Sequence, residues 1–252
     1  MKSKIISIHS FRGGTGKSNI TANLSALLAA DGYKVGLIDT DIQSPGIHVL
    51  FGMDQQEIKN SLNDYLWGKC AIKDAAHDMT PTLGGDISGQ VYLIPSSIKA
   101  GEIARVLREG YDISLLNDGF HEVIRELDLD ILVIDTHPGL NEETLLSIAI
   151  SDVLGIILRP DSQDYQGTGV TVEVARKLDV PNMKLIVNKV PDVYNFDEVR
   201  AKVQNTYEAP VAAVIPHSDE VMALASSGIF SMMYPDHRVS HLLKELKDVM
   251  IT

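Results

Sequence analysis

The chain has 252 residues, of which 44% are hydrophobic and 22% charged, a composition typical of a soluble globular protein with a sizeable core. Its net charge of −12 argues against broad nucleic-acid binding, which needs a basic face, although a local basic patch stays open. The single cysteine, Cys70, excludes an internal disulfide and suits a reducing compartment, so we expect a cytoplasmic protein.

The N-terminal residues predict no targeting segment. Residues 1–10 run directly into an apolar strand and carry no signal-peptide cleavage pattern. The best candidate for a membrane span, residues 148–158, is short and is interrupted by Asp152 and Gly155. We therefore expect no membrane-spanning helix.

Seven short apolar segments are predicted to be β-strands. They consist mostly of consecutive Ile, Val and Leu, which is typical of parallel strands buried on both faces. The predicted strands are residues 4–9, 35–39, 91–94, 130–135, 153–158, 184–188 and 211–215. Helical patterns lie between them. This alternation predicts a doubly wound α/β fold, with a mostly parallel sheet of about seven to eight strands flanked by helices.

The helical stretches have apolar residues on one side. Ile20 and Leu24 fall on one face of the first helix, and Gly32 is placed to end it. Residues 62–76 are expected to form a small helical excursion from the sheet. Because no linker is recognisable, we expect one domain over residues 1–252.

A glycine-rich loop, HSFRGGTGKS at residues 9–18, joins the first predicted strand to the first predicted helix. A phosphate loop binds anions because successive backbone N–H groups point at the phosphates from the start of a helix. The lysine then reaches the β- and γ-phosphates, and the serine hydroxyl suits Mg²⁺. The predicted nucleotide-binding residues here are Gly13, Gly14, Thr15, Gly16, Lys17, Ser18 and Asn19. The usual formula is broken, because Phe11 stands where a glycine is expected.

This loop resembles that of the MinD/ParA family of P-loop ATPases, written G/A-K-G-G-x-G-K-[ST]. It departs from the family at two positions. Phe11 stands where the family has a small residue, and Arg12 replaces the family's signature lysine. In the family that lysine crosses a dimer interface to the partner's ATP. Arginine keeps the positive charge and adds a planar guanidinium suited to phosphate oxygens. The resemblance therefore implies that Arg12 acts in trans as a catalytic residue, in addition to Lys17. The alternative is a salt bridge of Arg12 on the monomer surface.

The second predicted strand ends in Asp39-Thr40-Asp41. Carboxylates at positions i and i+2 of a strand point to the same side, so both can converge on one cation. The resemblance implies that Asp41 orients the attacking water as a catalytic residue and that Asp39 lies nearer the metal. Without the loop, such a pattern would indicate only a turn at the end of a strand.

Residues 131–139, ILVIDTHPG, read as an apolar strand that ends in an aspartate, the Walker B pattern. The Asp135 carboxylate would accept hydrogen bonds from Mg²⁺-bound water or from Ser18, which completes a predicted metal site with Asp39. The resemblance implies a switch segment here, in which the Gly139 N–H approaches the γ-phosphate. His137 could contact the water or respond to pH, or be only a polar loop residue.

The predicted strand at residues 184–188 ends in Asn188, which in the family hydrogen-bonds the nucleotide base. GTP-binding proteins use N-K-x-D at this point. Here Pro191 occupies the aspartate position and Asp192 comes one residue late, so ATP is favoured over GTP. Pro216, in a segment that resembles the family's late I-P-x-S, would flank the adenine.

Several relatives in the same superfamily fit less well. Iron–sulfur carriers, iron-protein reductases and arsenite-pump ATPases need more than one cysteine, and Cys70 alone cannot build their sites. His237 and His241 have helical i, i+4 spacing but no third ligand nearby, so no zinc site is expected. Residues 239–250 have helical spacing and balanced charge, so we expect this helix to pack on the domain rather than anchor to a membrane.

The resemblance implies an ATP-dependent dimerisation switch that positions or partitions a cellular cargo, whether DNA, a protein array or a microcompartment. With ATP and Mg²⁺ bound, two subunits would close into a homodimer. Hydrolysis to ADP and phosphate, stimulated by a partner protein, would release it. Two alternatives stay open: a metabolic ATP-dependent ligase or synthetase on the same fold, and a nucleotide-binding scaffold with little hydrolysis.

Overall fold

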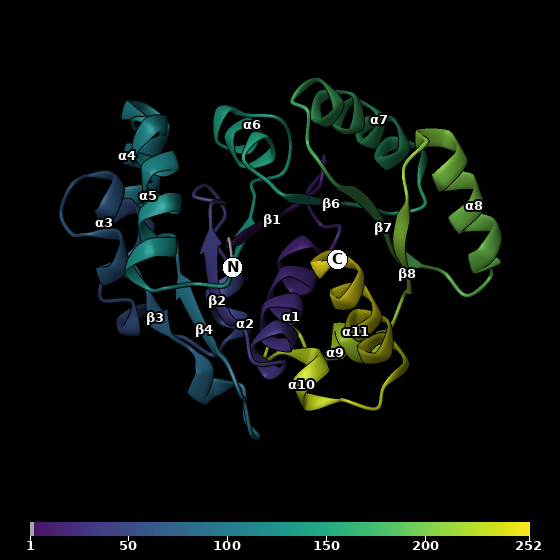
Figure 1. The fold of residues 1–252 in the computed structure, drawn as a ribbon, viewed down its shortest axis with the longest axis horizontal. Coiled ribbons are helices and arrows are strands. Elements are labelled where there is room, and N and C mark those ends of the chain that lie inside the picture. The colour runs from purple at the N-terminus through teal and green to yellow at the C-terminus, as the bar shows by residue number, and fades with distance from the viewer. Residues whose placement is uncertain (1–2) are drawn as a thin grey trace.

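The computed structural model describes residues 3–252 and is built around one eight-stranded sheet (Figure 1). The strands are β1 (Lys4–His9), β2 (Lys34–Asp39), β3 (His77–Asp78), β4 (Gln90–Ile94), β5 (Ile131–Asp135), β6 (Val153–Leu158), β7 (Met183–Val190) and β8 (Val211–Pro216). They lie in the order β3-β4-β2-β5-β1-β6-β7-β8. All neighbours are parallel except β3 and β4. The predicted doubly wound α/β fold is confirmed.

Helices cover both faces of this sheet (Figure 1). They are α1 (Lys17–Ala30), α2 (Ile47–Leu50), α3 (Leu62–Leu66), α4 (Ala100–Glu109), α5 (Ile113–Glu126), α6 (Glu142–Ala149), α7 (Ser162–Lys177), α8 (Phe196–Tyr207), α9 (Asp219–Ala223), α10 (Phe230–Met233) and α11 (Arg238–Ile251). Three short 3₁₀ helices span Gln55–Glu57, Ile72–Ala75 and Thr80–Thr82. Within residues 3–252, no helix is both long enough and apolar enough to cross a membrane.

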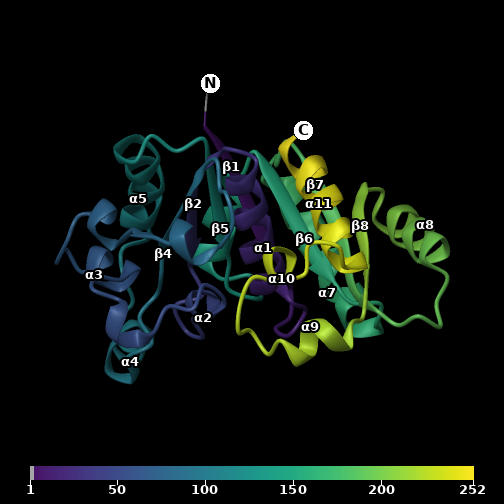
Figure 2. The ribbon, with the colours of Figure 1, turned by 90° about the horizontal axis from the view of Figure 1, so that it is seen from below.

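Alternate residues of a strand belong to different hydrophobic cores. Ile6 and Ile8 of β1 pack with α1 and α11 on one face, whereas Ile5 packs with α5 on the other. A third core joins Leu154 and Ile156 of β6 to α7 and α8. Burial on both faces explains why these strands read as continuous apolar runs. In the turned view, α3, α4 and α5 lie at one end of the molecule and α8 at the other (Figure 2).

Helix α1 is buried on almost every side because it lies between the sheet and the C-terminal helices α10 and α11 (Figure 1). Polar groups within it are paired: the Asn23 side-chain oxygen accepts the Ser231 backbone N–H at 2.7 Å. Just beyond its C-terminus, Gly32 adopts a left-handed φ of 98°, as its position predicts. The last helix, α11, buries Leu246 and Met250 against this layer, so its predicted packing is confirmed.

The predicted excursion at residues 62–76 is also confirmed, as α3 and the 3₁₀ helix Ile72–Ala75, which pack on α5. The two-residue strand β3 was not predicted. It is too short to show a period and pairs antiparallel at the edge of the sheet. The carboxyl ends of β1, β2 and β5 are neighbours, so the segments that follow them meet at one edge of the sheet, where ligands of such folds bind.

Candidate functional site

The loop between β1 and α1 presents backbone amides to an open cavity. Gly14 and Gly16 adopt left-handed φ values of 78° and 94°, which favour glycine. A Cβ at Gly16 would lie 2.5 Å from the Asn188 side-chain nitrogen, so a larger residue would displace Asn188. Among residues 3–252, no side chain caps the start of α1. Its first N–H groups are therefore free for an anion.

A cavity of about 470 Å³ opens at this loop. It is lined by ten of the residues predicted from sequence: Gly13, Gly14, Thr15, Gly16, Lys17, Ser18, Asn19, Asp41, Asn188 and Pro216. The Thr15 hydroxyl is buried there without a hydrogen-bond partner in the described chain. Four other predicted residues, Arg12, Asp39, Asp135 and Gly139, lie behind or beside this lining within residues 3–252.

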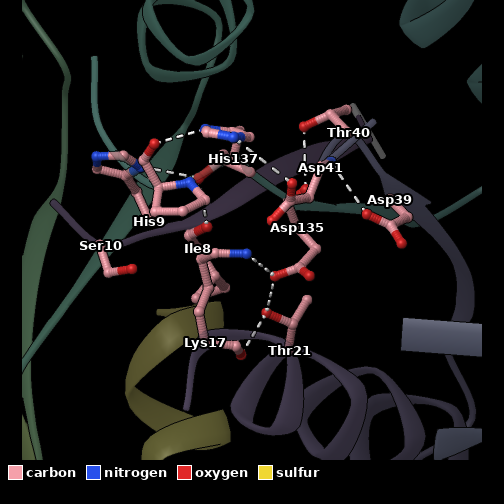
Figure 3. Close-up of polar contacts among 12 residues, drawn as sticks. Ile8, His9, Ser10, Lys17, Thr21, Asp39, Thr40, Asp41, Asp135 and His137 are labelled. Atoms are coloured by element: carbon pink, nitrogen blue, oxygen red, sulfur yellow. Dashed lines mark hydrogen bonds and ion pairs between the residues drawn. The ribbon is translucent and has the colours of Figure 1, made fainter. Parts of the chain in front are cut away.

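Behind the loop, Lys17 is held in a buried ion pair. Its Nζ lies 3.0 Å from Asp135 Oδ1, and the two side chains are 7% and 1% exposed. Thr21, one turn further along α1, donates to the same carboxylate oxygen at 2.9 Å (Figure 3). Thr21 was not predicted, although its i+4 spacing from Lys17 places both on one face of α1.

The second oxygen of Asp135 offers a place for a bound metal's water. Asp135 Oδ2 is buried and has no hydrogen-bond partner within residues 3–252. A buried carboxylate oxygen without a donor is costly, and a water of a magnesium ion would satisfy it. The Ser18 hydroxyl lines the adjoining cavity. The residues present therefore fit Mg²⁺ with oxygen ligands.

Asp39 and Asp41 have different surroundings. Asp39 is fully buried, and its two oxygens accept the backbone N–H groups of Asp41 at 3.0 Å and Gly46 at 3.2 Å. Burial and the nearby Asp135 carboxylate raise the pKa of Asp39 to about 8. In this arrangement Asp39 shapes the loop after β2 and lies behind the cavity.

Asp41, by contrast, lies at the cavity wall. Its Oδ1 accepts the Ser44 N–H at 3.1 Å and lies 3.8 Å from His137 Nε2 (Figure 3). Burial raises the pKa of Asp41, and the positive charge of Lys17 opposes that shift. Asp41 is thus the carboxylate positioned to contact a molecule in the cavity.

Phe11 and Arg12, the two departures from the family loop, both contact α7. The Phe11 ring lies over Gly167, where an added Cβ would be only 2.1 Å from the ring. Arg12 is 40% exposed, and its guanidinium lies 3.5 Å from Asp164 and 3.8 Å from Asp161. Phe11 therefore packs against a helix instead of filling the phosphate loop, and Arg12 forms the surface ion pair that was the alternative in the sequence.

Gly139 and Asn188, both predicted to contact the nucleotide, form hydrogen bonds within the protein. The Gly139 N–H donates to the Ser10 carbonyl at 3.2 Å, so a phosphate would have to replace that bond to use it. The Asn188 amide donates to the Thr15 carbonyl at 2.7 Å. Next to it, Lys189 Nζ donates to the Gly14 carbonyl at 2.9 Å, a loop contact that the sequence did not predict. The end of β7 thus fastens the phosphate loop.

The far wall of the cavity is mostly apolar. It is formed by Ile215, Pro216, Val221, Met222, Val239 and Leu243. Asp192, which comes one residue too late for a guanine-binding motif, is 78% exposed and lies 3.9 Å from Arg238. It does not line the cavity within the described chain. The wall therefore offers apolar contacts to a base, and Asp192 does not supply there the carboxylate that guanine needs.

Comparisons with known proteins show the family and the fold of the chain. A family model described as an AAA domain matches residues 3–186. An uncharacterised ATP-binding protein of Methanocaldococcus jannaschii is 29% identical over 242 residues, covering 96% of this chain and 85% of the relative. The solved MinD cell division protein of Aquifex aeolicus has a TM-score of 0.80 at 19% identity, covering 99% of this chain and 97% of that one. The septum site-determining protein MinD of Pyrococcus horikoshii, solved with Mg-ADP, has a TM-score of 0.79 at 21% identity, covering 98% and 95%.

The family match includes the phosphate loop, the aspartates after β2 and the end of β5, from which the site is built. The likeness to the two solved structures extends the common fold over almost the whole chain. The chain belongs to the MinD/ParA family of P-loop ATPases.

Proposed function

We propose that this chain is an ATP-dependent dimerisation switch that acts in the cytoplasm to position a cellular cargo. It would bind ATP with Mg²⁺, close into a homodimer, and return to monomers when ATP is hydrolysed to ADP and phosphate. The observation that carries the proposal is the uncapped amide cradle of Gly13–Ser18, with Lys17 buried behind it and Asp41 at its wall. This arrangement provides both anion binding and a carboxylate for the attacking water.

Lys17 supplies the charge that grips the nucleotide. Its buried ion pair with Asp135 keeps the ammonium group behind the loop, where it could exchange the Asp135 carboxylate for a phosphate of the nucleotide. The backbone N–H groups and the Thr15 hydroxyl add hydrogen bonds that need no reorganisation. Asn188 and Lys189 brace the loop from outside, which maintains the cradle before a ligand arrives.

Ser18 and Asp135 would hold Mg²⁺, with Asp39 organising the loop behind them. The bound metal would neutralise charge on the transferring phosphoryl group. Asp41 orients the attacking water, because it is the carboxylate that reaches the cavity wall. Slow turnover is expected, since a switch needs a lasting bound state, and a partner protein would accelerate it.

Arg12 links hydrolysis to dimerisation in this proposal. It lies beside the cradle, partly exposed, and is held by Asp164 and Asp161. In the homodimer Arg12 would leave these carboxylates and stabilise the partner's triphosphate. Arginines supplied in this way accelerate phosphoryl transfer by roughly 10³- to 10⁵-fold in other systems.

Light scattering on a sizing column tests the proposal. We expect ATP with Mg²⁺ to convert wild-type monomer to dimer, and ADP to leave it monomeric. The Asp41→Ala variant should remain a dimer in ATP. The Arg12→Ala variant should lose dimer formation or turnover. The Arg108→Ala variant, changed at an exposed position of α4, should behave as wild type. A dimer–monomer ratio that ignores ATP would contradict the switch and favour a metabolic ligase. ATP binding without phosphate release would favour a scaffold.

The trapped Asp41→Ala dimer also offers a way to the cargo and the stimulating partner. Proteins or DNA retained by this variant in ATP, but not in ADP, would be candidates for the positioned cargo. Phosphate release by wild-type protein should then rise when the retained component is added back. An increase caused instead by a small-molecule substrate would contradict the switch.

A further inference from the structure

Two arginines share two carboxylates where the phosphate loop meets the start of α7. Arg12 comes from the loop, and Arg159 comes from the segment that joins β6 to α7 (Figure 1). Both face Asp161, just before α7, and Asp164, in its first turn. The function proposed above gives Arg12 a place in the partner's site and gives Arg159 none.

Arg159 holds Asp164 with three hydrogen bonds. Its backbone N–H and its Nε donate to Asp164 Oδ2 at 2.9 and 3.0 Å, and its Nη2 donates to Asp164 Oδ1 at 3.3 Å. The same Nη2 lies 3.2 Å from Asp161 Oδ2. Arg12 reaches both carboxylates with one nitrogen, Nη1, at the longer distances of 3.5 and 3.8 Å. The two carboxylates are therefore paired mainly with Arg159.

The burial of Asp164 gives this difference its energetic weight. The Asp164 side chain is 2% exposed, and removing the cation from a buried carboxylate is strongly unfavourable. When Arg12 leaves, Asp164 keeps its three hydrogen bonds to Arg159. Asp161 Oδ1 likewise keeps the backbone N–H groups of Gln163 and Asp164, at 3.1 and 3.0 Å. The departure of Arg12 therefore has a low free-energy cost.

The backbone at Arg12 is anchored while its side chain is partly exposed. The Ser10 hydroxyl donates to the Arg12 carbonyl at 2.8 Å. The ring of the preceding residue, Phe11, packs over Gly167 of α7. The guanidinium can therefore turn away from α7 by rotation of its own side chain, and the phosphate loop keeps its shape.

We propose that Arg159 is a positioning residue that keeps Arg12 free to change partners, an inference that rests on the function proposed above. Because Arg159 occupies the buried Asp164 carboxylate, Arg12 is not locked within its own subunit. Asp161 acts in the opposite sense, since its carboxylate, 43% exposed, holds Arg12 weakly in the monomer. Arg159 and Asp161 together set the ATP concentration at which the chain forms a dimer.

Variants at these two positions should shift dimerisation in opposite directions. In Arg159→Gln, Arg12 becomes the cationic partner of Asp164, so the ATP concentration at half-dimerisation should rise roughly tenfold or more. The Arg159→Lys variant keeps a cation on Asp164 and should lie between Arg159→Gln and wild type. Asp161→Asn removes the charge but keeps a capping oxygen for α7, so this concentration should fall by up to about fivefold.

A matched control separates this effect from the loss of a helix cap. Asp112→Asn makes the same change at the exposed N-cap of α5, where the carboxylate accepts the Ser114 N–H at 2.9 Å. It should leave the ATP concentration at half-dimerisation unchanged. Light scattering at graded ATP concentrations measures every variant. The affinity of the monomer for ADP should stay as in wild type throughout, because the inference concerns only the release of Arg12.

A second measurement tests the competition between the arginines without a dimer. Double-mutant cycles in urea unfolding, built from Arg12→Gln and Asp164→Asn, report the coupling of these two side chains in the monomer. We expect the coupling to change the folding equilibrium constant less than about fivefold in the wild-type background. In the Arg159→Gln background it should be roughly tenfold or more.

A wild-type ATP requirement in Arg159→Gln would overturn the inference, as would shifts of the same sign in Arg159→Gln and Asp161→Asn. A matching loss of ADP affinity would also overturn it, because Arg159 would then support the cavity as a whole. A coupling that does not rise in the Arg159→Gln background has the same consequence. Wild-type protein that stays monomeric in ATP would instead refute the proposed switch, and the unfolding cycles would still decide whether Arg159 competes with Arg12.

Discussion

The inner and outer parts of the site differ in how firmly their side chains are held. In the inner part, Lys17 and Asp135 are at most 7% exposed and are joined at 3.0 Å, with Thr21 on the same oxygen. In the outer part, Arg12 is 40% exposed with its nearest carboxylate at 3.5 Å, and His137 is 22% exposed with its nearest carboxylate at 3.8 Å. In the proposed function, the inner part serves binding. The outer part holds the groups that can change partners.

This difference separates two tasks that a switch must perform. In the proposed function, a largely preorganised inner cradle would bind a triphosphate with little rearrangement. Exposed and loosely paired charges cost little to move, because surface ion pairs contribute about 0–1 kcal/mol. Changes inside the cradle should therefore affect both folding and binding, and changes at the rim should affect mainly turnover or nothing.

The largest effect is expected from Lys17→Ala. It leaves Asp135 buried without its cation, and breaking a buried ion pair costs about 3–5 kcal/mol of unfolding free energy. ATP affinity should fall roughly 100-fold or more, because the charge on the phosphates is lost. Urea unfolding and equilibrium ATP binding measure the two effects. Lys177→Ala, at an exposed position of α7, is the control; equal behaviour of the two variants would erase the distinction between inner and outer parts.

A smaller effect is expected where Phe11 packs on α7. Gly167→Ala forces a Cβ into the ring and should destabilise the fold by about 1–3 kcal/mol, as overpacking does. Gly169→Ala on the same helix meets only an ordinary contact at 3.8 Å and should be neutral or stabilise by up to about 1 kcal/mol. Adding Phe11→Ala to Gly167→Ala should recover part of the loss, because it removes the ring but keeps the Phe11 Cβ, which would lie 2.9 Å from the added Cβ. Without such recovery in thermal melts, the Phe11–Gly167 packing is refuted.

His9 provides a test through pH. Burial lowers its pKa from 6.5 to about 3, with Lys17 and His137 acting in the same direction. Between these values the unfolded chain binds a proton that the folded chain does not, so His9 makes stability fall as pH drops from 6.5 toward 3. In His9→Asn, which keeps a donor for Thr136, the slope of unfolding free energy between pH 5.5 and 4 should be shallower by about 1.4 kcal/mol per pH unit. The exposed His121→Asn should keep the wild-type slope, and an unchanged slope in His9→Asn would contradict the buried, neutral imidazole.

The smallest effect is expected at Asp192. It is 78% exposed, pairs with Arg238 only at 3.9 Å, and lies outside the cavity lining in the described chain. Asp192→Ala should change unfolding free energy by less than about 0.5 kcal/mol and leave the preference for ATP over GTP unaltered. Competition between the two nucleotides for wild type and variant measures this. A variant that loses discrimination would show that Asp192 contacts the base.

The sequence predicted the fold and the members of the cradle because both depend on local patterns. Continuous apolar runs identified the strands, and the loop formula identified residues from Gly13 to Asn19. Parallel strands then bring Asp39 and Asp135 to one edge of the sheet as a consequence of topology. Those predictions needed only the chain order and the type of each element.

The side-chain partners across the site could not be predicted in the same way. Arg12 and Asp164 are 152 positions apart, and their contact depends on how α7 packs against β6, the strand that neighbours β1. The same holds for Phe11 and Gly167, and for the bond from Lys189 to the loop. Strand β3 was not predicted because a strand of two residues is too short to show an alternating pattern. Contacts of this kind are set by packing between distant elements and have no local signature in the chain.

The central claim is that the amides of Gly13–Ser18 hold a triphosphate although Phe11 precedes them. A crystal structure of the chain grown with Mg²⁺ and a non-hydrolysable ATP analogue tests it most directly. We predict phosphates on these amides and on Lys17, with the Phe11 ring still packed against Gly167. Electron density that shows the nucleotide elsewhere, or the phenyl ring inside an empty cradle, would contradict the account.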